Sequence, residues 1–196
     1  LNFIRNTPLG FDKEKILVMQ LNDTLIINNI DAFRQEVQRH PGIEKTTLSN
    51  TVPGNFVGKR IMTIENSSGE MVEKTINNMY IDYSYLDVMG MKLKSGGRNF
   101  SREYGSDREH AFLINEAAAR EMNWGNDAVG KRIIPGVNVD DNDIPEGRII
   151  GVIEDFHYAS LHNPIEPLIM MLSENTRFMR NLSIRTATDH TDEVLS

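Results

Sequence analysis

Cysteine is absent from the 196-residue chain. Its absence excludes a disulfide framework, thiolate metal sites and catalysis by a cysteine nucleophile. Because a cysteine-free chain is compatible with both the cytosol and the periplasm, the absence does not fix the compartment.

Long hydrophobic runs are also absent. The longest unbroken apolar stretch, 168–172, has five residues, whereas a membrane-spanning helix needs about 20. We therefore expect no membrane crossing and no signal peptide within these 196 residues. The sequence begins with Leu1 rather than Met and ends at Ser196, where a helix is expected to begin. These ends suggest an excised piece of a longer protein.

Basic residues are fewer than acidic ones. The chain has 28 acidic and 21 basic residues, a formal net charge of −7 and a pI near 5.3. This balance argues against nucleic acid or an anionic membrane surface as the main partner. Apolar residues make up 39% and charged residues 25%, which excludes collagen-like, low-complexity and wholly disordered chains. The length fits one domain, or one domain with an inserted lobe.

The hydrophobic pattern predicts more strands than helices. A strand at 16–21, a helix at 30–39 and a strand at 43–49 form a strand–helix–strand unit, in which the apolar side chains of the helix share one face. We expect further strands or extended segments at 59–65, 70–76, 79–83, 112–114, 129–137, 148–155, 167–172 and 182–186. Short helices are expected at 85–90, ended by Gly90, at 116–123, capped by Asn115, and from 192 onward.

The pattern of expected strands and helices changes after Asn50. Strands and helices alternate at both ends of the chain, whereas the middle is rich in strands, with the turn residues of a hairpin at 66–69. This pattern predicts the α+β class. It also suggests a split domain, whose two ends pair around an inserted lobe.

Residues 125–131 match the first seven positions of a phosphate-binding P-loop. The eighth position should be Ser or Thr, whose hydroxyl ligates magnesium, but it is Arg132. A P-loop also needs a strand before it and a helix after it, and here the predicted order is reversed. We interpret the segment as a turn between a helix and a strand.

Asp155, His157 and Ser160 have the residue types of a hydrolytic triad. At a spacing of two, Asp155 and His157 would lie on the same face of a strand and could pair. Ser160 is too close in sequence for an easy in-line arrangement, and the chain has no Gly-x-Ser-x-Gly motif. We favour a strand end whose His and Asp cap a loop, with a hydrolase as the third hypothesis.

Metal ligands do not form a recognised pattern in this sequence. No His-x-x-x-His and no His-Glu-x-x-His spacing occurs among the five histidines. An acidic loop contains Asp140, Asp141, Asn142, Asp143 and Glu146. Its oxygens could bind a hard cation, but Pro145 stands where a calcium-binding loop would need glycine. We favour a solvated loop and assign no catalytic, cofactor-binding or metal-binding residue.

Several stretches, taken in order, resemble a known family. They are 9–13, 52–54, 81–86 with 89–91, 97–101, 113–119, 129–132 and 150–162. In this order and spacing they are similar to the MacB-like periplasmic core domain of ABC-transporter permeases of the FtsX type. The stretch Asp-Phe-His-Tyr at 155–158 is especially similar to the versions common in Bacteroidetes. The resemblance covers nearly the whole chain.

The resemblance implies a periplasmic domain of an inner-membrane permease, placed between its first and second spanning helices. It implies a porter-like subdomain of strand–helix–strand units, 1–52 and 163–196, whose second half is truncated. A β-rich lobe called Sabre, 53–162, is inserted into it. In this family ATP is hydrolysed by a separate ABC ATPase subunit or domain. The periplasmic domain relays the resulting conformational change to substrate or partner proteins, a role called mechanotransmission that serves transmembrane transport such as efflux.

The family carries no catalytic residues, so the resemblance implies no enzyme activity and no cofactor. The implied partners are the ABC ATPase, reached through the full-length permease, and periplasmic adaptor or other envelope proteins. The parent protein would be embedded in the membrane and would work as a homodimer or permease pair. Nucleic acid is not an expected partner. The alternative is a periplasmic module that senses a small ligand, which would need a concave apolar pocket with a few polar groups.

Overall fold

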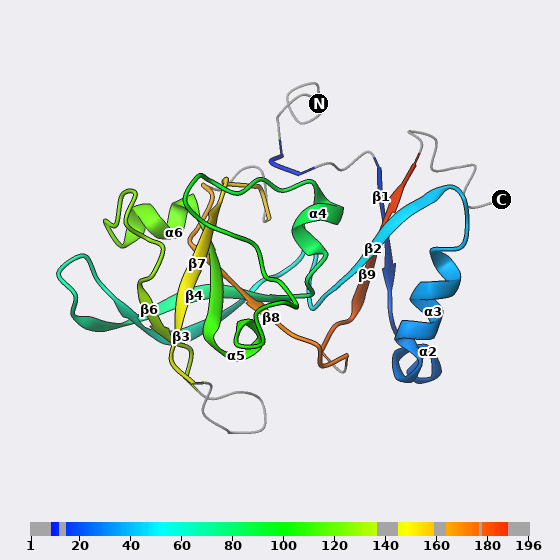
Figure 1. Cartoon of the computed structure of the whole chain (residues 1–196), viewed down its shortest axis with the longest axis horizontal. Coiled ribbons are helices and arrows are strands. Elements are labelled where there is room, and N and C mark those ends of the chain that lie inside the picture. Colours follow the sequence, from blue (N-terminus) through cyan, green and yellow to red (C-terminus); the bar gives the residue numbers. More distant parts are fainter. Residues whose placement is uncertain (1–8, 12–14, 137–144, 159–163, 177, 188–196) are drawn as a thin grey trace. The chain divides into compact units, whose positions relative to one another are not determined.

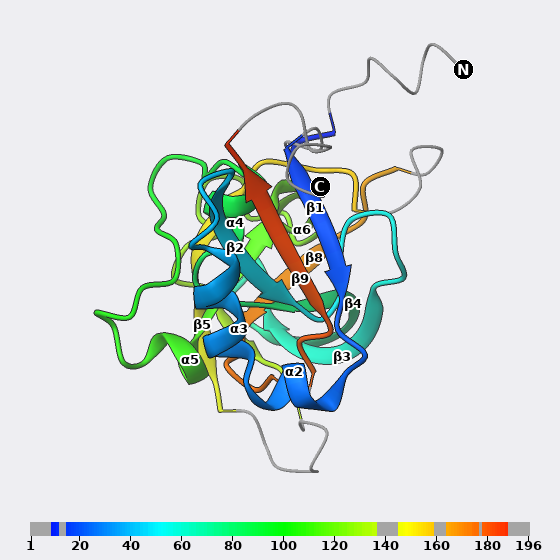
Figure 2. The same cartoon turned by 90° about the vertical axis from the view of Figure 1, so that its right-hand side faces the viewer.

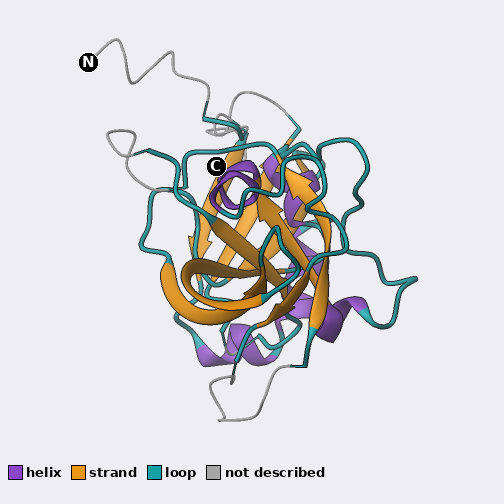
Figure 3. Cartoon of the chain, turned by 90° about the vertical axis from the view of Figure 1, so that its left-hand side faces the viewer, coloured by secondary structure: helices purple, strands orange, loops and turns teal. Residues whose placement is uncertain are grey.

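The computed structural model describes residues 9–11, 15–136, 145–158, 164–176 and 178–187, which form a strand-rich mixture of α and β structure (Figure 1). The strands are β1 (Ile16–Gln20), β2 (Ile43–Ser49), β3 (Gly58–Glu65), β4 (Met71–Ile81), β5 (Ala111–Asn115), β6 (Arg132–Ile134), β7 (Gly147–Ile153), β8 (Leu168–Leu172) and β9 (Asn181–Thr186). The helices are α2 (Thr24–Asn28), α3 (Ile30–Val37), α4 (Tyr85–Met89), α5 (Asp107–His110) and α6 (Glu116–Glu121). Figure 3 shows how short these helices are beside the strands. Within the described ranges, none of the helices has both the length and the apolar character that crossing a membrane requires.

The chain divides into two compact units. One comprises 1–52, 80–91 and 173–196, and the other comprises 53–79 and 92–172. The expected porter-like subdomain was 1–52 with 163–196. The observed units differ from this in two segments: 80–91 belongs to the first unit, and 163–172 belongs to the second. The assignment of these units to a porter-like and an inserted subdomain stays a prediction.

In the first unit, β9 lies between β1 and β2 in an antiparallel sheet. Helices α2 and α3 cover one face of it (Figure 2). Ile30, Phe33 and Val37 of α3 pack with the sheet residues Leu182 and Ile184, so the predicted amphipathic helix is confirmed. Burial of this apolar surface is the main stabilising contribution to the unit.

Helix α4 lies on the opposite face of β2 and β9. Lys45 of β2 pairs with Asp87 of the helix at 3.2 Å, and Arg185 of β9 donates to the carbonyl of Val88 at 2.8 Å. The helix ends at Gly90, whose φ of 67° is left-handed, as the sequence predicted. Glycine suits this position because it has no Cβ to oppose a positive φ.

The second unit contains strands in the order β4-β3-β6-β7-β5-β8. Strands β5 and β7 are parallel, whereas β4–β3, β3–β6, β6–β7 and β5–β8 are antiparallel. Helix α6 lies in the connection between β5 and β7, because two parallel strands need a crossover rather than a tight turn. The inner side chains are almost fully buried, and they include Ile64, Leu113, Ile114, Ile133, Ile149, Ile153 and Phe156.

The hairpin predicted at 66–69 joins β3 to β4. The side-chain oxygen of Asn66 accepts from the backbone N–H groups of Ser68 and Glu70, each at 2.9 Å. Gly69 has a φ of 86°. The turn residues of the sequence therefore form the turn through an Asx contact and a left-handed glycine.

Some expected elements differ from the structure. The two strands expected at 70–76 and 79–83 are one continuous strand, β4, because the intervening Asn77 and Asn78 are buried in the sheet. The short helices α2 and α5 were not expected. Of the extended segment expected at 129–137, only 132–134 is a strand in the described part. The helix expected from 192 lies outside the described residues.

Candidate functional site

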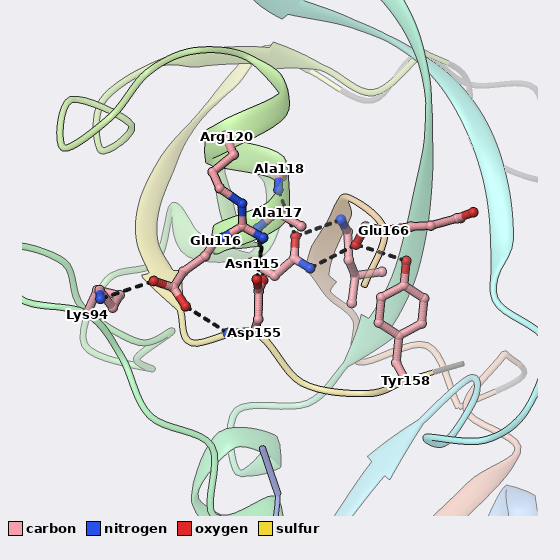
Figure 4. Close-up of polar contacts among 10 residues, drawn as sticks. Lys94, Asn115, Glu116, Ala117, Ala118, Arg120, Asp155, Tyr158 and Glu166 are labelled. Carbon is pink, nitrogen blue, oxygen red and sulfur yellow. Dashed lines mark hydrogen bonds and ion pairs between the residues drawn. The ribbon is translucent and has the colours of Figure 1, made fainter. Parts of the chain in front are cut away.

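Polar side chains gather around the start of helix α6 (Figure 4), and some of them, Asn115 and Asp155 among them, lie in the stretches that resemble the transporter family. Asn115 caps the helix and accepts from the N–H of Ala118 at 3.0 Å. Asp155, which follows β7, accepts from the N–H of Ala117 at 2.8 Å. Two of the N–H groups that a helix start leaves without intrahelical partners are thus satisfied.

The first residue of the helix completes the connection to the 154–158 segment. Glu116 accepts from the backbone N–H of Asp155 at 3.1 Å and pairs with Lys94 at 3.1 Å. Arg120, one turn later, reaches the Asp155 carboxylate at 2.5 Å. Glu116 thus accepts from the backbone of Asp155, while the Asp155 carboxylate accepts from Ala117 and Arg120, so that the helix start and the 154–158 segment are held together.

Asn115 also connects the helix to strand β8. Its side-chain oxygen accepts from the N–H of Leu168 at 2.9 Å, and its amide donates to the carbonyl of Glu166 at 2.9 Å. The side chain is fully buried. Because a buried polar group without partners costs free energy, these bonds are what allows a polar residue in this position.

A second asparagine, Asn77 of β4, organises the other side of the cluster. Its amide donates to the Tyr158 hydroxyl and to the Glu166 carboxylate, both at 2.9 Å. Tyr158 in turn donates to the Glu166 carbonyl at 3.1 Å, and Lys59 pairs with the Glu166 carboxylate at 3.3 Å. Strands β3 and β4 thereby contact the segments before β8 and after β7.

The surroundings of the cluster favour the ionised form of Glu116 and Glu166 and the neutral form of Tyr158. Burial acts to raise the pKa of Glu116, but the hydrogen bond from Asp155 and the charges of Lys94 and Arg120 outweigh it and lower the pKa. The hydrogen bond from Asn77, with Lys59, lowers the pKa of Glu166. Burial and the nearby carboxylates raise the pKa of the Tyr158 hydroxyl. Neither glutamate is thus kept protonated as a general acid would be.

Among the described residues, the bonds of Asp155 are not those of the hydrolytic triad suggested by the sequence. Strand β7 ends at Ile153, and the residues after it are not extended in a ladder, so the expected strand face shared by Asp155 and His157 does not exist. Both oxygens of Asp155 instead accept bonds from α6. Asp155 therefore bonds Ala117 and Arg120 of helix α6, whereas the triad hypothesis needs it to bond His157. Ser160 lies outside the described residues.

The segment that resembles a P-loop has the predicted turn geometry. Helix α6 precedes it and β6 follows it, the reverse of a P-loop. The ammonium of Lys131, at the position of the phosphate-binding lysine, pairs with Glu65 at 3.1 Å, and Arg132 donates to the same carboxylate at 2.8 Å. The hydrogen bonds from Arg132 and Lys131 lower the pKa of Glu65 to about 2. These cations have a structural partner within the fold.

The acidic loop lies mostly outside the described residues, which include Pro145 and Glu146 but not 137–144. The carbonyl of Glu146 is 2.7 Å from Nδ1 of His110. In the part of the chain that the structure describes, no group of three or more metal-ligating side chains gathers at one point.

Two surface hollows in the second unit share Arg98, Arg148 and Ile150. Their volumes are about 470 Å³ and 360 Å³. Arg98 bonds the buried Asp107 through both of its terminal nitrogens, at 2.6 and 2.7 Å, and lies over the ring of Tyr104 at 4.0 Å. The positive charge of Arg98 is therefore already balanced by the carboxylate of Asp107.

The sequence alone did not single out several residues of these networks. Asn77, Glu166 and Arg120 carry no motif, and they meet their partners only because strands distant in sequence pair in the sheet. The one local signal was Asn115, which stands directly before an alanine-rich helix.

The comparisons with known proteins identify a fold. No protein-family model matches the sequence, and no curated protein matches it. The periplasmic region of MacB from Actinobacillus actinomycetemcomitans superposes with a TM-score of 0.59 and 14% identity, over 94% of this chain and 80% of that one. A domain described as part of a permease from Porphyromonas gingivalis gives 0.57 and 20%, over 94% and 81%. The extracellular domain of the ABC-type transporter YknZ from Gram-positive bacteria gives 0.54 and 14%, over 90% and 86%. The resemblance read from the sequence is confirmed at the level of the fold: the chain has the fold of these periplasmic and extracellular transporter domains.

Proposed function

We propose that the chain is the extracytoplasmic domain of an ABC-transporter permease of the MacB-like, FtsX type. The observation that carries this proposal is the likeness to three such domains over at least 90% of the chain. The ordered series of short stretches in the sequence supports it independently, since that resemblance rests on residue identities and not on the fold.

In this proposal the domain relays force and performs no chemistry of its own. A relay needs elements that move as bodies, and therefore contacts that hold each body rigid. The network around Asn115 and Asp155 fits that need, because buried and partly buried hydrogen bonds connect helix α6 to strand β8 and to the segment that follows β7. The lowered pKa values of Glu65, Glu116 and Glu166 fit structural carboxylates rather than acids in a cleft.

The two units suit the porter-like and Sabre-like parts of such a domain. The first unit contains the strand–helix–strand arrangement of β1, α2–α3 and β2, closed by β9. The second is an insertion into that chain path and is rich in strands. We assign the first unit to the porter-like subdomain and the second to the inserted lobe.

The partners follow from this assignment. The ABC ATPase would act through the membrane part of the full-length permease, on the other side of the inner membrane from this domain. Periplasmic adaptor or other envelope proteins would contact its exposed surface, and the permease would work as a homodimer or a pair.

The test is a distance measurement in the full-length permease with its ATPase, in lipid vesicles. Since this chain has no cysteine, cysteines introduced at the exposed Gln35 and Glu73 give spin labels at known places, one in each unit. We expect the label distances to change between the nucleotide-free and ATP-trapped states. A pair within the second unit, Glu73 and Asn126, is the control and should not change.

The proposal fails if the nucleotide leaves every label distance unchanged. It also fails if the purified chain turns over ATP or hydrolyses ester or peptide substrates. An ATPase variant that binds but does not hydrolyse nucleotide separates the effect of binding from that of hydrolysis.

A second candidate function is the sensing of a small ligand, favoured by the hollows that share Arg98 and Arg148. Their volumes fall in the range of ligand pockets, about 300–1,000 Å³. A bound ligand raises the unfolding temperature by mass action. A thermal-shift screen of small metabolites, repeated with Arg148→Ala, would support sensing if a stabilising compound lost its effect in the variant.

A further inference from the structure

Three buried hydroxyl groups of the first unit have no hydrogen-bond partner among the described residues. They belong to Ser49 of β2, Ser183 of β9 and Tyr85 of α4. All three side chains are buried, with relative exposures of 0%. A hydroxyl that is buried without a partner costs free energy, and native proteins rarely leave one so.

The sheet register brings two of these hydroxyls to the same place. Thr47 lies opposite Ser183, and Ser49 lies opposite Asn181 in the antiparallel β2–β9 ladder. Ser49 and Ser183 therefore point from the same face as Thr47 and are diagonal neighbours across the two strands.

Helix α4 brings the third hydroxyl over that face. Lys45, on the same face as Thr47 and Ser49, pairs with Asp87 of the helix, and the Thr47 hydroxyl donates to Asp82, just before the helix. The helix thus runs opposite to β2, with its first turn towards Ser49. Side chains on a helix lean towards its N-terminus, so the phenol of Tyr85 leans the same way.

We propose that Ser49, Ser183 and Tyr85 form an internal site for ordered water. A buried water makes two to four hydrogen bonds, and three hydroxyls, each able to donate and accept, supply that number. One water would satisfy all three groups at once, whereas no direct bond among the described residues satisfies any of them.

The surroundings select neutral water rather than an ion. The carboxylate of Asp82 is occupied by Arg34 at 3.0 Å and by the N–H of Leu48 at 3.0 Å, in addition to Thr47. Burial, and the charge of Asp82, raise the pKa of Tyr85, so its hydroxyl keeps its proton. The site therefore offers hydroxyls and no unbalanced charge.

Replacing Tyr85 by phenylalanine tests the site through the sign of its effect on the 196-residue chain. If water bonds the phenol, Tyr85→Phe removes a satisfied hydrogen bond and lowers the midpoint of thermal unfolding by about 2–4 °C. If the phenol is unsatisfied, the same change removes a buried polar group without a partner and raises the midpoint. A raised midpoint would therefore overturn the proposal.

Two other tyrosines are matched controls for this substitution. Tyr158 is buried with known partners, so Tyr158→Phe should lower the midpoint. Tyr104 is half exposed, so Tyr104→Phe should leave it almost unchanged.

A double substitution and a crystal structure complete the test. If Tyr85 and Ser183 share one water, Tyr85→Phe with Ser183→Ala should lose less than the sum of the single changes. In a crystal structure at high resolution, we expect density for a water within hydrogen-bond distance of at least two of the three hydroxyls. Additive losses, or a protein side chain in that position, would refute the shared water.

Discussion

The side-chain oxygen of Asn115 accepts from the backbone N–H of Leu168 at 2.9 Å, across 53 residues of sequence. The same oxygen accepts from Ala118 and so caps helix α6. One buried amide therefore fixes both where the helix begins and where strand β8 begins.

Asn115→Ala should destabilise the chain by about 2–4 kcal/mol, because it removes an N-cap, leaves the N–H of Leu168 without the partner that Asn115 supplies, and takes one of two donors from the carbonyl of Glu166. Urea unfolding measures this loss. The exposed Asn126→Ala is the matched control and should change stability by less than about 0.5 kcal/mol. Equal stability of both variants would show that the Asn115 network contributes little.

Local signals in the sequence were sufficient to predict one of the two roles of Asn115, the N-cap of helix α6, but not its bond to strand β8. An asparagine before an alanine-rich stretch predicts an N-cap from the chemistry of one turn, and Gly90 is a helix end for the same reason. The bond to Leu168 depends on the pairing of β5 with β8, which no local pattern specifies. The outline of strands and helices was thus predictable, and the polar network was not.

Tertiary contacts also overrode local preferences where the sequence suggested a break. Asn77 and Asn78 are poor strand formers, and they divided the expected strands at 70–76 and 79–83. In the structure Asn77 bonds Tyr158 and Glu166, and Asn78 donates to the carbonyl of Gly58 at 3.3 Å. These partners come from distant parts of the chain, so burial of the two amides could not be inferred from neighbouring residues.

Gly151→Ala should be strongly destabilising, because β7 lies against the backbone of the 94–98 segment. A Cβ at Gly151 would stand 2.6 Å from the carbonyl oxygen of Arg98 and 2.9 Å from side-chain carbons of Leu113 and Leu93. We expect a loss of about 1–3 kcal/mol or more from such overpacking. Thermal and urea unfolding both report it.

Gly58→Ala is the control for that substitution, since a Cβ at this strand glycine meets nothing within 4 Å. It should leave stability unchanged within about 0.5 kcal/mol or increase it slightly, because alanine restricts the unfolded chain. If both variants lost a similar amount of stability, the close approach of other atoms to Gly151 would not be the cause of the loss.

Asp155→Ala should cost more than Arg120→Ala, although the two side chains form one ion pair. Arg120 is 63% exposed, and exposed pairs contribute about 0–1 kcal/mol. Asp155 also satisfies the N–H of Ala117, which is comparable to a helix cap of about 1 kcal/mol. Hydrogen exchange at the Ala117 amide should accelerate in Asp155→Ala and hardly change in Arg120→Ala. The reverse order would indicate that the ion pair is the dominant contact.

The ion pairs of Glu65 predict a specific loss of stability in acid. Arg132 and Lys131 lower the pKa of Glu65 from 4.5 to about 2. Because the pKa is lower in the folded than in the unfolded chain, the stabilisation is present above about pH 4.5 and is lost as the pH falls towards 2. Glu65→Gln should therefore be less stable than the wild-type chain at pH 7, and the difference should shrink between pH 4.5 and 2. Glu121→Gln, at an exposed pair with Lys74, should show a much smaller difference at every pH, and a difference for Glu65→Gln that stays constant with pH would contradict the assignment.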